Sequence, residues 1–92
     1  MAYTYFKEED IFYNDVEQYI NGYLNTYEIM EAYKPSKVIG AVKRALEITK
    51  ESYTRDSGWN KITILSSLHV VEAALDELEE DYPEEEYPEL WL

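Results

Sequence analysis

The chain of 92 residues is long enough for one small domain, spanning residues 1–92, and too short for two. Its 20 Asp and Glu residues outnumber 8 Lys and Arg residues, which gives a formal net charge of −12. Because 46 % of the residues are hydrophobic, the composition favours a folded domain with an acidic surface over a disordered chain. The lack of cysteine excludes disulfide scaffolds, thiolate zinc sites and cysteine nucleophiles.

Hydrophobic residues never occur in a run longer than three, whereas a membrane helix needs about 20 and a signal-peptide core about 7–15. We therefore expect a cytoplasmic protein without a membrane partner. Direct binding to nucleic acid is not expected either, because a protein needs Lys and Arg to displace the counterions of the phosphates.

The first of three predicted helices covers about residues 8–33. The apolar positions that follow the helical period there are Phe12, Val16, Tyr19, Ile20, Tyr23, Leu24, Tyr27 and Met30. The dipeptide Asn21-Gly22 interrupts this pattern. Either the helix is kinked or split at this point, or the dipeptide forms the turn of a short hairpin.

Two further helices are predicted after Lys34-Pro35-Ser36, which breaks the chain. The second covers about residues 37–53, with an apolar stripe of Val38, Val42, Ala45, Leu46, Thr49 and Tyr53. The third covers about residues 60–81, with an apolar face of Ile64, Leu65, Leu68, Val71, Leu75, Leu78 and Tyr82. Two prolines and many charges predict that the tail, residues 82–92, is extended. The expected fold is all-α, a small three-helix bundle with an extended acidic C-terminal tail.

Motifs of enzymes and cofactor sites are missing from the sequence. Its three glycines are too scattered for a phosphate-binding loop, and no serine lies in a nucleophile elbow. The single histidine, His69, lies beside an apolar stripe without a partner motif. The acids near the C-terminus lack the alternating spacing of a calcium-binding loop. We therefore expect no catalysis, no cofactor and no specific metal site.

The charges are unevenly distributed. Residues 1–33 carry seven acids and one base (net −6), residues 34–61 carry seven bases and three acids (net +4), and residues 62–92 carry ten acids and no base (net −10). In the predicted third helix, Glu72, Asp76, Glu79 and Glu80 fall on one face, away from the apolar stripe. Six acids in the ten residues 72–81 correspond to one charge per roughly 2.5 Å of helix axis, compared with about one per 1.7 Å for duplex DNA.

Carboxylates at this density can stand in for phosphates in a DNA-binding channel. A second acidic row is expected from the tail, from the first helix or from a second subunit. The residues predicted to mimic phosphates are Glu72, Asp76, Glu77, Glu79, Glu80, Asp81, Glu84, Glu85, Glu86, Glu8, Glu9, Asp10, Asp15 and Glu17.

Aromatic residues gather at both ends of the chain, where a small core has little room for them. Tyrosine is favoured at protein interfaces because its rigid ring offers contact area as well as a hydroxyl group. These residues either pack on the domain or form the contact of a homodimer. The candidates are Tyr3, Tyr5, Phe6, Tyr87, Leu90, Trp91 and Leu92.

The whole chain, from the opening Met1-Ala2-Tyr3-Thr4-Tyr5-Phe6 to its acidic, aromatic end, resembles the phage anti-restriction DNA-mimic proteins, above all the anti-restriction nuclease family of T-even phages. The resemblance implies a cytoplasmic, dimeric inhibitor that binds a host DNA-binding protein. The implied partner is a modification-dependent restriction endonuclease of the McrBC type, with other DNA-binding proteins as further partners. The basic middle third departs from a uniform mimic. Its residues Lys37, Lys43, Arg44, Lys50 and Lys61 must face away from the partner or pair internally.

The sequence thus predicts a non-enzymatic DNA mimic that protects phage DNA. The alternative is a helical protein-interaction module, such as an immunity protein, antitoxin or adaptor, recognised through its aromatic ends. A third class, a carboxylate enzyme or metal buffer, predicts activity or a thermal shift with divalent ions. Salt separates the first two, because mimicry weakens steeply with ionic strength whereas an aromatic interface does not.

Overall fold

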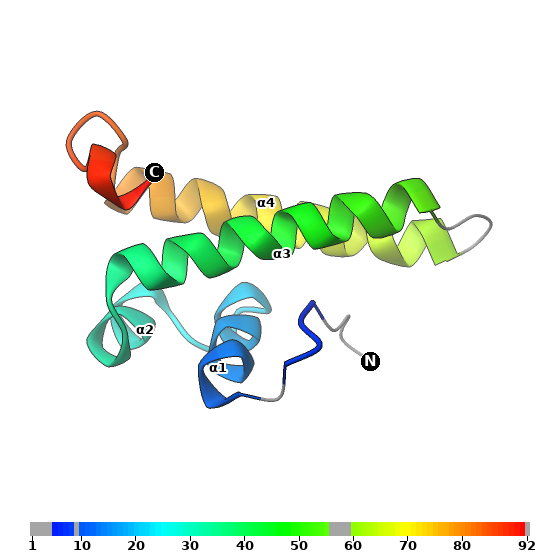
Figure 1. Ribbon diagram of the computed structural model, residues 1–92, viewed down its shortest axis with the longest axis horizontal. Coiled ribbons are helices and arrows are strands. Elements are labelled where there is room, and N and C mark those ends of the chain that lie inside the picture. The colour runs from blue at the N-terminus through cyan, green and yellow to red at the C-terminus, as the bar shows by residue number, and fades with distance from the viewer. Residues whose placement is uncertain (1–4, 9, 56–59, 92) are drawn as a thin grey trace.

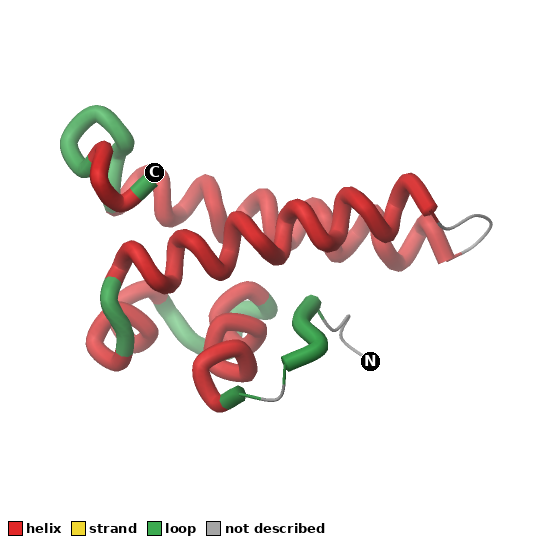
Figure 2. Tube along the Cα trace, viewed as in Figure 1, coloured by secondary structure: helices red, strands yellow, loops and turns green. Residues whose placement is uncertain are grey.

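The computed structural model describes residues 5–8, 10–55 and 60–91 of the chain. It contains four helices, α1 (Ile11–Ile20), α2 (Thr26–Ala32), α3 (Pro35–Arg55) and α4 (Asn60–Asp81), followed by a single 3₁₀ turn, η1 (Pro88–Leu90). The described residues contain no strand (Figure 2). The predicted all-α class is therefore confirmed.

The two long helices α3 and α4 lie side by side along the longest axis of the molecule, which measures 41 × 27 × 19 Å. The shorter helices α1 and α2 pack against one side of this pair (Figure 1). The C-terminal turn lies at the end of the pair where α4 ends and α3 begins, and η1 contacts α3. The acidic end of α4 and the first half of α3 therefore lie at the same end of the molecule.

The core lies where α1, α2 and the N-terminal segment meet the α3–α4 pair. Its largest fully buried side chains are Val16, Ile29, Val38, Ile39, Val42, Thr49, Val71 and Leu78. Burying each large aliphatic side chain stabilises the fold by about 1.5–3 kcal/mol. The one polar member, Thr49, donates a 2.7 Å hydrogen bond to the carbonyl of Ala45, so its hydroxyl is paired.

The first predicted helix is split into α1 and α2, which is one of the two alternatives left open by the sequence. Asp10 caps α1 by accepting a 2.9 Å hydrogen bond from the backbone of Phe12. Gly22 follows the end of α1 with a φ of +87°, a conformation that favours glycine. Asn25 and Glu28 then form a reciprocal capping box that starts α2. The dipeptide Asn21-Gly22 is therefore a helix end and not a hairpin turn.

This break corrects the predicted apolar stripe beyond residue 20. A continuous helix places Tyr23 and Tyr27 on the core side, but they are 75 % and 72 % exposed. Ile29 is buried instead, at 1 % exposure. The reason is that α2 starts with a new direction and phase after the turn, so the periodicity of α1 does not carry across it.

The two later helices match their predicted ranges closely. α3 begins two residues early, at Pro35, whose missing N–H and fixed φ suit the first helical position. α4 has the predicted bounds. On its predicted apolar face Leu65 is 38 % exposed, while the small residues Ser67 and Ala74 are buried at 8 % and 6 %. Small side chains at these positions let neighbouring segments approach α4 closely.

The C-terminal tail is not extended, which corrects the prediction. Pro83 ends α4, and its carbonyl accepts hydrogen bonds from the backbones of Glu86 and Tyr87 at 3.0 and 2.8 Å. After η1, the indole Nε1 of Trp91 donates to the carbonyl of Tyr82 at 2.8 Å. Prolines do prevent a continued α-helix here, but they also favour tight turns. These turns and the indole hydrogen bond fold the chain back on itself.

Candidate functional site

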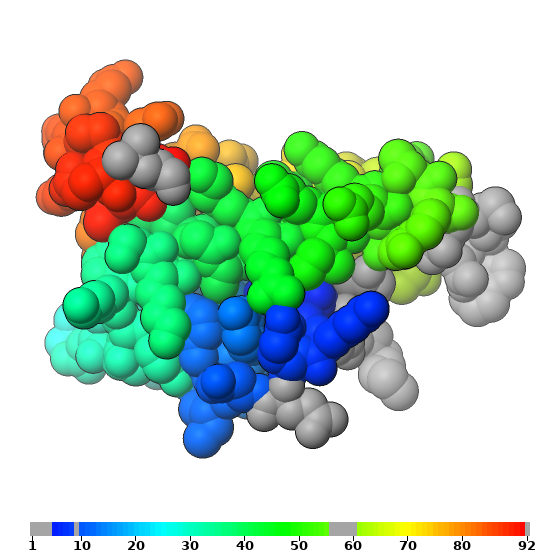
Figure 3. Space-filling view, in the orientation of Figure 1, coloured from blue at the N-terminus to red at the C-terminus, as the bar shows by residue number. Residues whose placement is uncertain are grey.

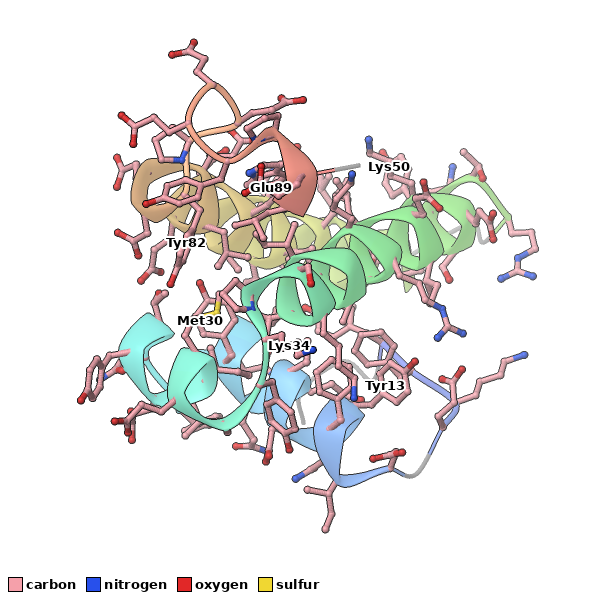
Figure 4. All side chains as sticks on the ribbon, turned by 60° about the vertical axis from the view of Figure 1, so that its left-hand side comes forward. Tyr13, Met30, Lys34, Lys50, Tyr82 and Glu89 are labelled. Atoms are coloured by element: carbon pink, nitrogen blue, oxygen red, sulfur yellow. The ribbon has the colours of Figure 1, made fainter. Side chains whose placement is uncertain are left out.

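Four acids of α4 form a row on its solvent side, opposite the buried residues of that helix. Glu72, Asp76, Glu79 and Glu80 are all exposed. Within the described part of the chain, none of these carboxylates makes a hydrogen bond or salt bridge. Figure 4 shows carboxylate groups projecting outward around this end of α4 and the turn that follows. We call these four residues the α4 acidic row.

Two further acids, Glu77 and Asp81, lie on the flank of α4 that faces α2. The Thr26 hydroxyl donates a 2.8 Å hydrogen bond to Oε1 of Glu77 and lies 3.2 Å from the Tyr19 hydroxyl. Burial raises the pKa of Tyr19, and the charges of Glu77 and Asp81 raise it further. Glu77 is therefore held in position, whereas the α4 acidic row is free.

The acids of the C-terminal turn, Glu84, Glu85 and Glu86, are exposed and continue the acidic surface beyond the end of α4. The space-filling view shows this turn protruding from one end of the molecule (Figure 3). The structure adds Glu28 and Glu31, which no pattern in the sequence marks as part of this surface. Both are exposed on α2, which the Thr26–Glu77 hydrogen bond ties to α4. No local signal in the sequence predicts that contact.

The acids near the N-terminus have internal roles instead. Glu8 pairs with Arg44 at 2.6 Å, and the hydrogen bond from this guanidinium lowers the pKa of Glu8. Asp10 caps α1, and Asp15 accepts a 2.7 Å hydrogen bond from the Tyr33 hydroxyl. Burial raises the pKa of Glu17, which is half-buried beside the backbone of Tyr5 and Phe6. Glu9 lies outside the described residues.

Most cations of the basic middle third are engaged within the molecule. Lys37 lies 4.3 Å above the centre of the Phe12 ring, and Lys61 lies 5.1 Å from that of Tyr53. The Lys43 ammonium group donates a 3.0 Å hydrogen bond to the carbonyl of Trp91. Arg44 binds Glu8, as described above. In the described part of the chain, the cations of the middle third without such a contact are Lys34, Lys50 and Arg55, all exposed. Figure 4 shows Lys50 on α3.

The aromatic ends mostly pack on the domain. Tyr5 and Phe6 are 3 % exposed and belong to the core, so they are not available for a dimer contact. Their burial corrects their place among the dimer candidates. Leu90 and Trp91 are half-buried against the same core. Tyr87 is 37 % exposed and contacts the Tyr82 ring edge-on. Tyr3 and Leu92 lie outside the described residues.

The described residues contain no group of three or more His, Cys, Asp or Glu side chains arranged to hold a metal ion. Among those residues, no helix combines the length and apolar character needed to cross a membrane. A scan against family models, a search of curated proteins and a search of solved structures gave no significant match to this chain.

Proposed function

We propose that this protein is a non-enzymatic DNA mimic that occupies the DNA-binding site of a host protein. The proposed partner, taken from the resemblance described above, is a modification-dependent restriction endonuclease of the McrBC type in the host cytoplasm. The carboxylates of α4 and the C-terminal turn stand in for phosphates in a basic channel. Occupying the channel excludes DNA, so the chain needs no chemistry of its own to protect phage DNA.

The observation that carries this proposal is the unpaired α4 acidic row. Carboxylates with internal partners are partly neutralised, whereas Glu72, Asp76, Glu79 and Glu80 offer their full charge to a partner. They are fixed on a helix of 22 residues, so their spacing is set before binding. A preorganised row loses little conformational entropy on association.

The internal contacts of the cations support the same proposal. A DNA mimic has to keep positive charge away from the basic channel of its partner. Lys37, Lys43, Arg44 and Lys61 are each held by an aromatic ring, a carbonyl or a carboxylate of this chain. Four of the seven cations of the middle third thus have internal partners, and the exposed cations without such a contact among the described residues are Lys34, Lys50 and Arg55.

The test compares two matched pairs of substitutions. Glu72→Gln with Asp76→Asn removes two charges spaced four residues apart in the α4 acidic row. Glu47→Gln with Glu51→Gln removes two charges at the same spacing on α3. DNA cleavage by a purified McrBC-type endonuclease is measured with increasing amounts of each variant, at low and high salt. We expect the α4 pair to weaken inhibition at least tenfold and the α3 pair to leave it within about twofold.

Adding Glu79→Gln and Glu80→Gln to the α4 pair should abolish inhibition at physiological salt, and duplex DNA should compete with the wild-type protein. Unchanged inhibition by this fourfold variant would disprove the assignment of the surface. Inhibition indifferent to both salt and duplex DNA would instead favour a protein-interaction module of the second class.

A further inference from the structure

The solvent side of α4 changes character halfway along the helix. Residues 62–71 carry no charge, whereas residues 72–81 carry six acids. In the uncharged half Ile62 is 71 % exposed, Leu65 38 % and Val70 39 %. These side chains stay exposed in the folded chain. A partner that covers them binds more tightly, because apolar surface is then removed from water.

A groove opens at the boundary between the two halves. It lies between α4 and the connection from α1 to α2, and has a volume of about 430 Å³. Its apolar lining consists of Ile20, Leu24, Val70, Ala73 and Ala74. We call it the boundary groove. Tyr19, Asn21, Gly22 and Asn25 line it as well, from the end of α1 and the connection to α2.

One acid, Glu77, also lines the boundary groove. The Thr26 hydroxyl occupies its Oε1 atom, and Oε2 accepts no hydrogen bond from the described residues. Asp81 follows four residues later, one helical turn further along the same flank. The apolar groove is therefore bordered by the fixed carboxylate of Glu77, and the carboxylate of Asp81 follows one helical turn beyond it.

We propose that the boundary groove receives one large apolar side chain of the partner protein, flanked by Lys or Arg residues that pair with Glu77 and Asp81. This inference rests on the proposed function, because the α4 acidic row calls for a basic partner. Charge complementarity selects the flanking residues, and the apolar lining selects the side chain between them.

DNA-binding proteins that kink the duplex carry this combination, since they insert an apolar wedge between base steps while Lys and Arg contact the phosphates. A groove that accepts the wedge imitates a kinked base step of DNA, whereas the α4 acidic row imitates the phosphate backbone of DNA. Straight duplex DNA has no comparable apolar groove. The boundary groove thus gives the mimic a means of preferring proteins that carry such a wedge.

The test uses two fluorescent peptides of equal length with the same Lys and Arg residues. One has Leu at its centre and the other has Ser. Binding to the full-length protein is measured by fluorescence anisotropy at low and high salt. We expect the Leu peptide to bind about tenfold more tightly, from burial of its side chain. The affinity for both peptides should fall as salt rises, and the ratio of the two affinities should stay the same.

Two variants test the lining separately, Val70→Gln and Ala73→Gln. Each should abolish the preference for Leu and leave the affinity for the Ser peptide within about twofold. Leu65→Gln is the matched control, because Leu65 is as exposed as Val70 but does not line the groove. It should keep the full preference. Glu77→Gln should lower the affinity for both peptides. Circular dichroism checks that every variant retains its helices.

Equal, salt-sensitive binding of the two peptides overturns the boundary groove and leaves the proposed DNA mimicry standing. A preference for Leu that survives both Val70→Gln and Ala73→Gln also overturns the groove. Failure of both peptides to bind at low salt overturns the proposed function, and the groove with it.

Discussion

The Thr26 hydroxyl lies between two side chains from other helices. It donates a 2.8 Å hydrogen bond to Glu77 on α4 and lies 3.2 Å from the hydroxyl of Tyr19 on α1. Because Thr26 has one proton to donate and gives it to Glu77, Tyr19 is the donor in the second bond. The first residue of α2 thus joins α1 to α4 and holds one of the predicted phosphate mimics in place.

Thr26→Val keeps the shape of the side chain but removes both hydrogen bonds. Tyr19 is 4 % exposed, so its hydroxyl then lacks a partner at a poorly hydrated site. We expect a loss of about 1–2 kcal/mol in the free energy of unfolding, measured by urea denaturation. Thr63→Val on the exposed side of α4 is the control and should change stability by less than about 0.5 kcal/mol. Equal effects of the two substitutions would show that this contact does not join the helices.

The Arg44–Glu8 ion pair predicts a pH dependence of stability. Its hydrogen bond lowers the pKa of Glu8 in the folded state. The pair therefore stabilises the protein above the ordinary pKa of glutamate, and this contribution is lost as the pH falls through the lowered pKa. The Glu8→Gln variant should melt at a lower temperature than the wild type at neutral pH. This difference between the two melting temperatures should shrink as the solution is acidified. A constant difference between the two proteins across that range contradicts a role for the charge.

Glu17 predicts a dependence of the opposite sign. Burial raises its pKa, so the ionised form is disfavoured in the folded state. As the pH falls through this raised pKa, protonation of Glu17 removes the cost of burying its charge. The stability of the wild type therefore rises relative to a variant that cannot titrate at this position. Glu17→Gln should therefore be more stable than the wild type at neutral pH, and the advantage should shrink on acidification. Thermal melts over a pH series test this, and a variant less stable at neutral pH would show that the backbone contacts require the carboxylate.

The α4 acidic row should reduce stability while it serves binding. Asp76 lies four residues from Glu72 and from Glu80 and three from Glu79, and like charges at these spacings repel each other on a helix. Acids near the C-terminus of a helix also oppose its dipole. Neutralising all four should raise the free energy of unfolding by about 1 kcal/mol, measured by urea denaturation.

Glu47→Gln with Glu51→Gln is the control for that measurement. These acids lie three or four residues from Lys43, Lys50 and Arg55, so their removal takes away favourable spacings. It should leave stability unchanged or slightly lower. A fourfold α4 variant that loses stability would mean that the row is structural.

Much of the fold follows from local sequence patterns. The bounds of α4 could be predicted because its periodicity is long and Pro83 follows its end. The exposure of Glu72, Asp76, Glu79 and Glu80 follows from the same period, since each lies opposite a buried apolar stripe. The split at Asn21-Gly22 could be predicted only as one of two alternatives, because the dipeptide suits a helix end and a hairpin turn equally well.

The sequence by itself therefore determined the helical class, the charge of the molecule and the acidic side of α4, all of which depend on residues within a few turns of each other. Tertiary structure alone decided which charges remain free. Arg44 reaches Glu8 across 36 residues, Thr26 reaches Glu77 across 51, and Tyr5 reaches Ser67 across 62. Such partners depend on how the helices pack, and packing depends on shape complementarity over the whole core, which no local period records.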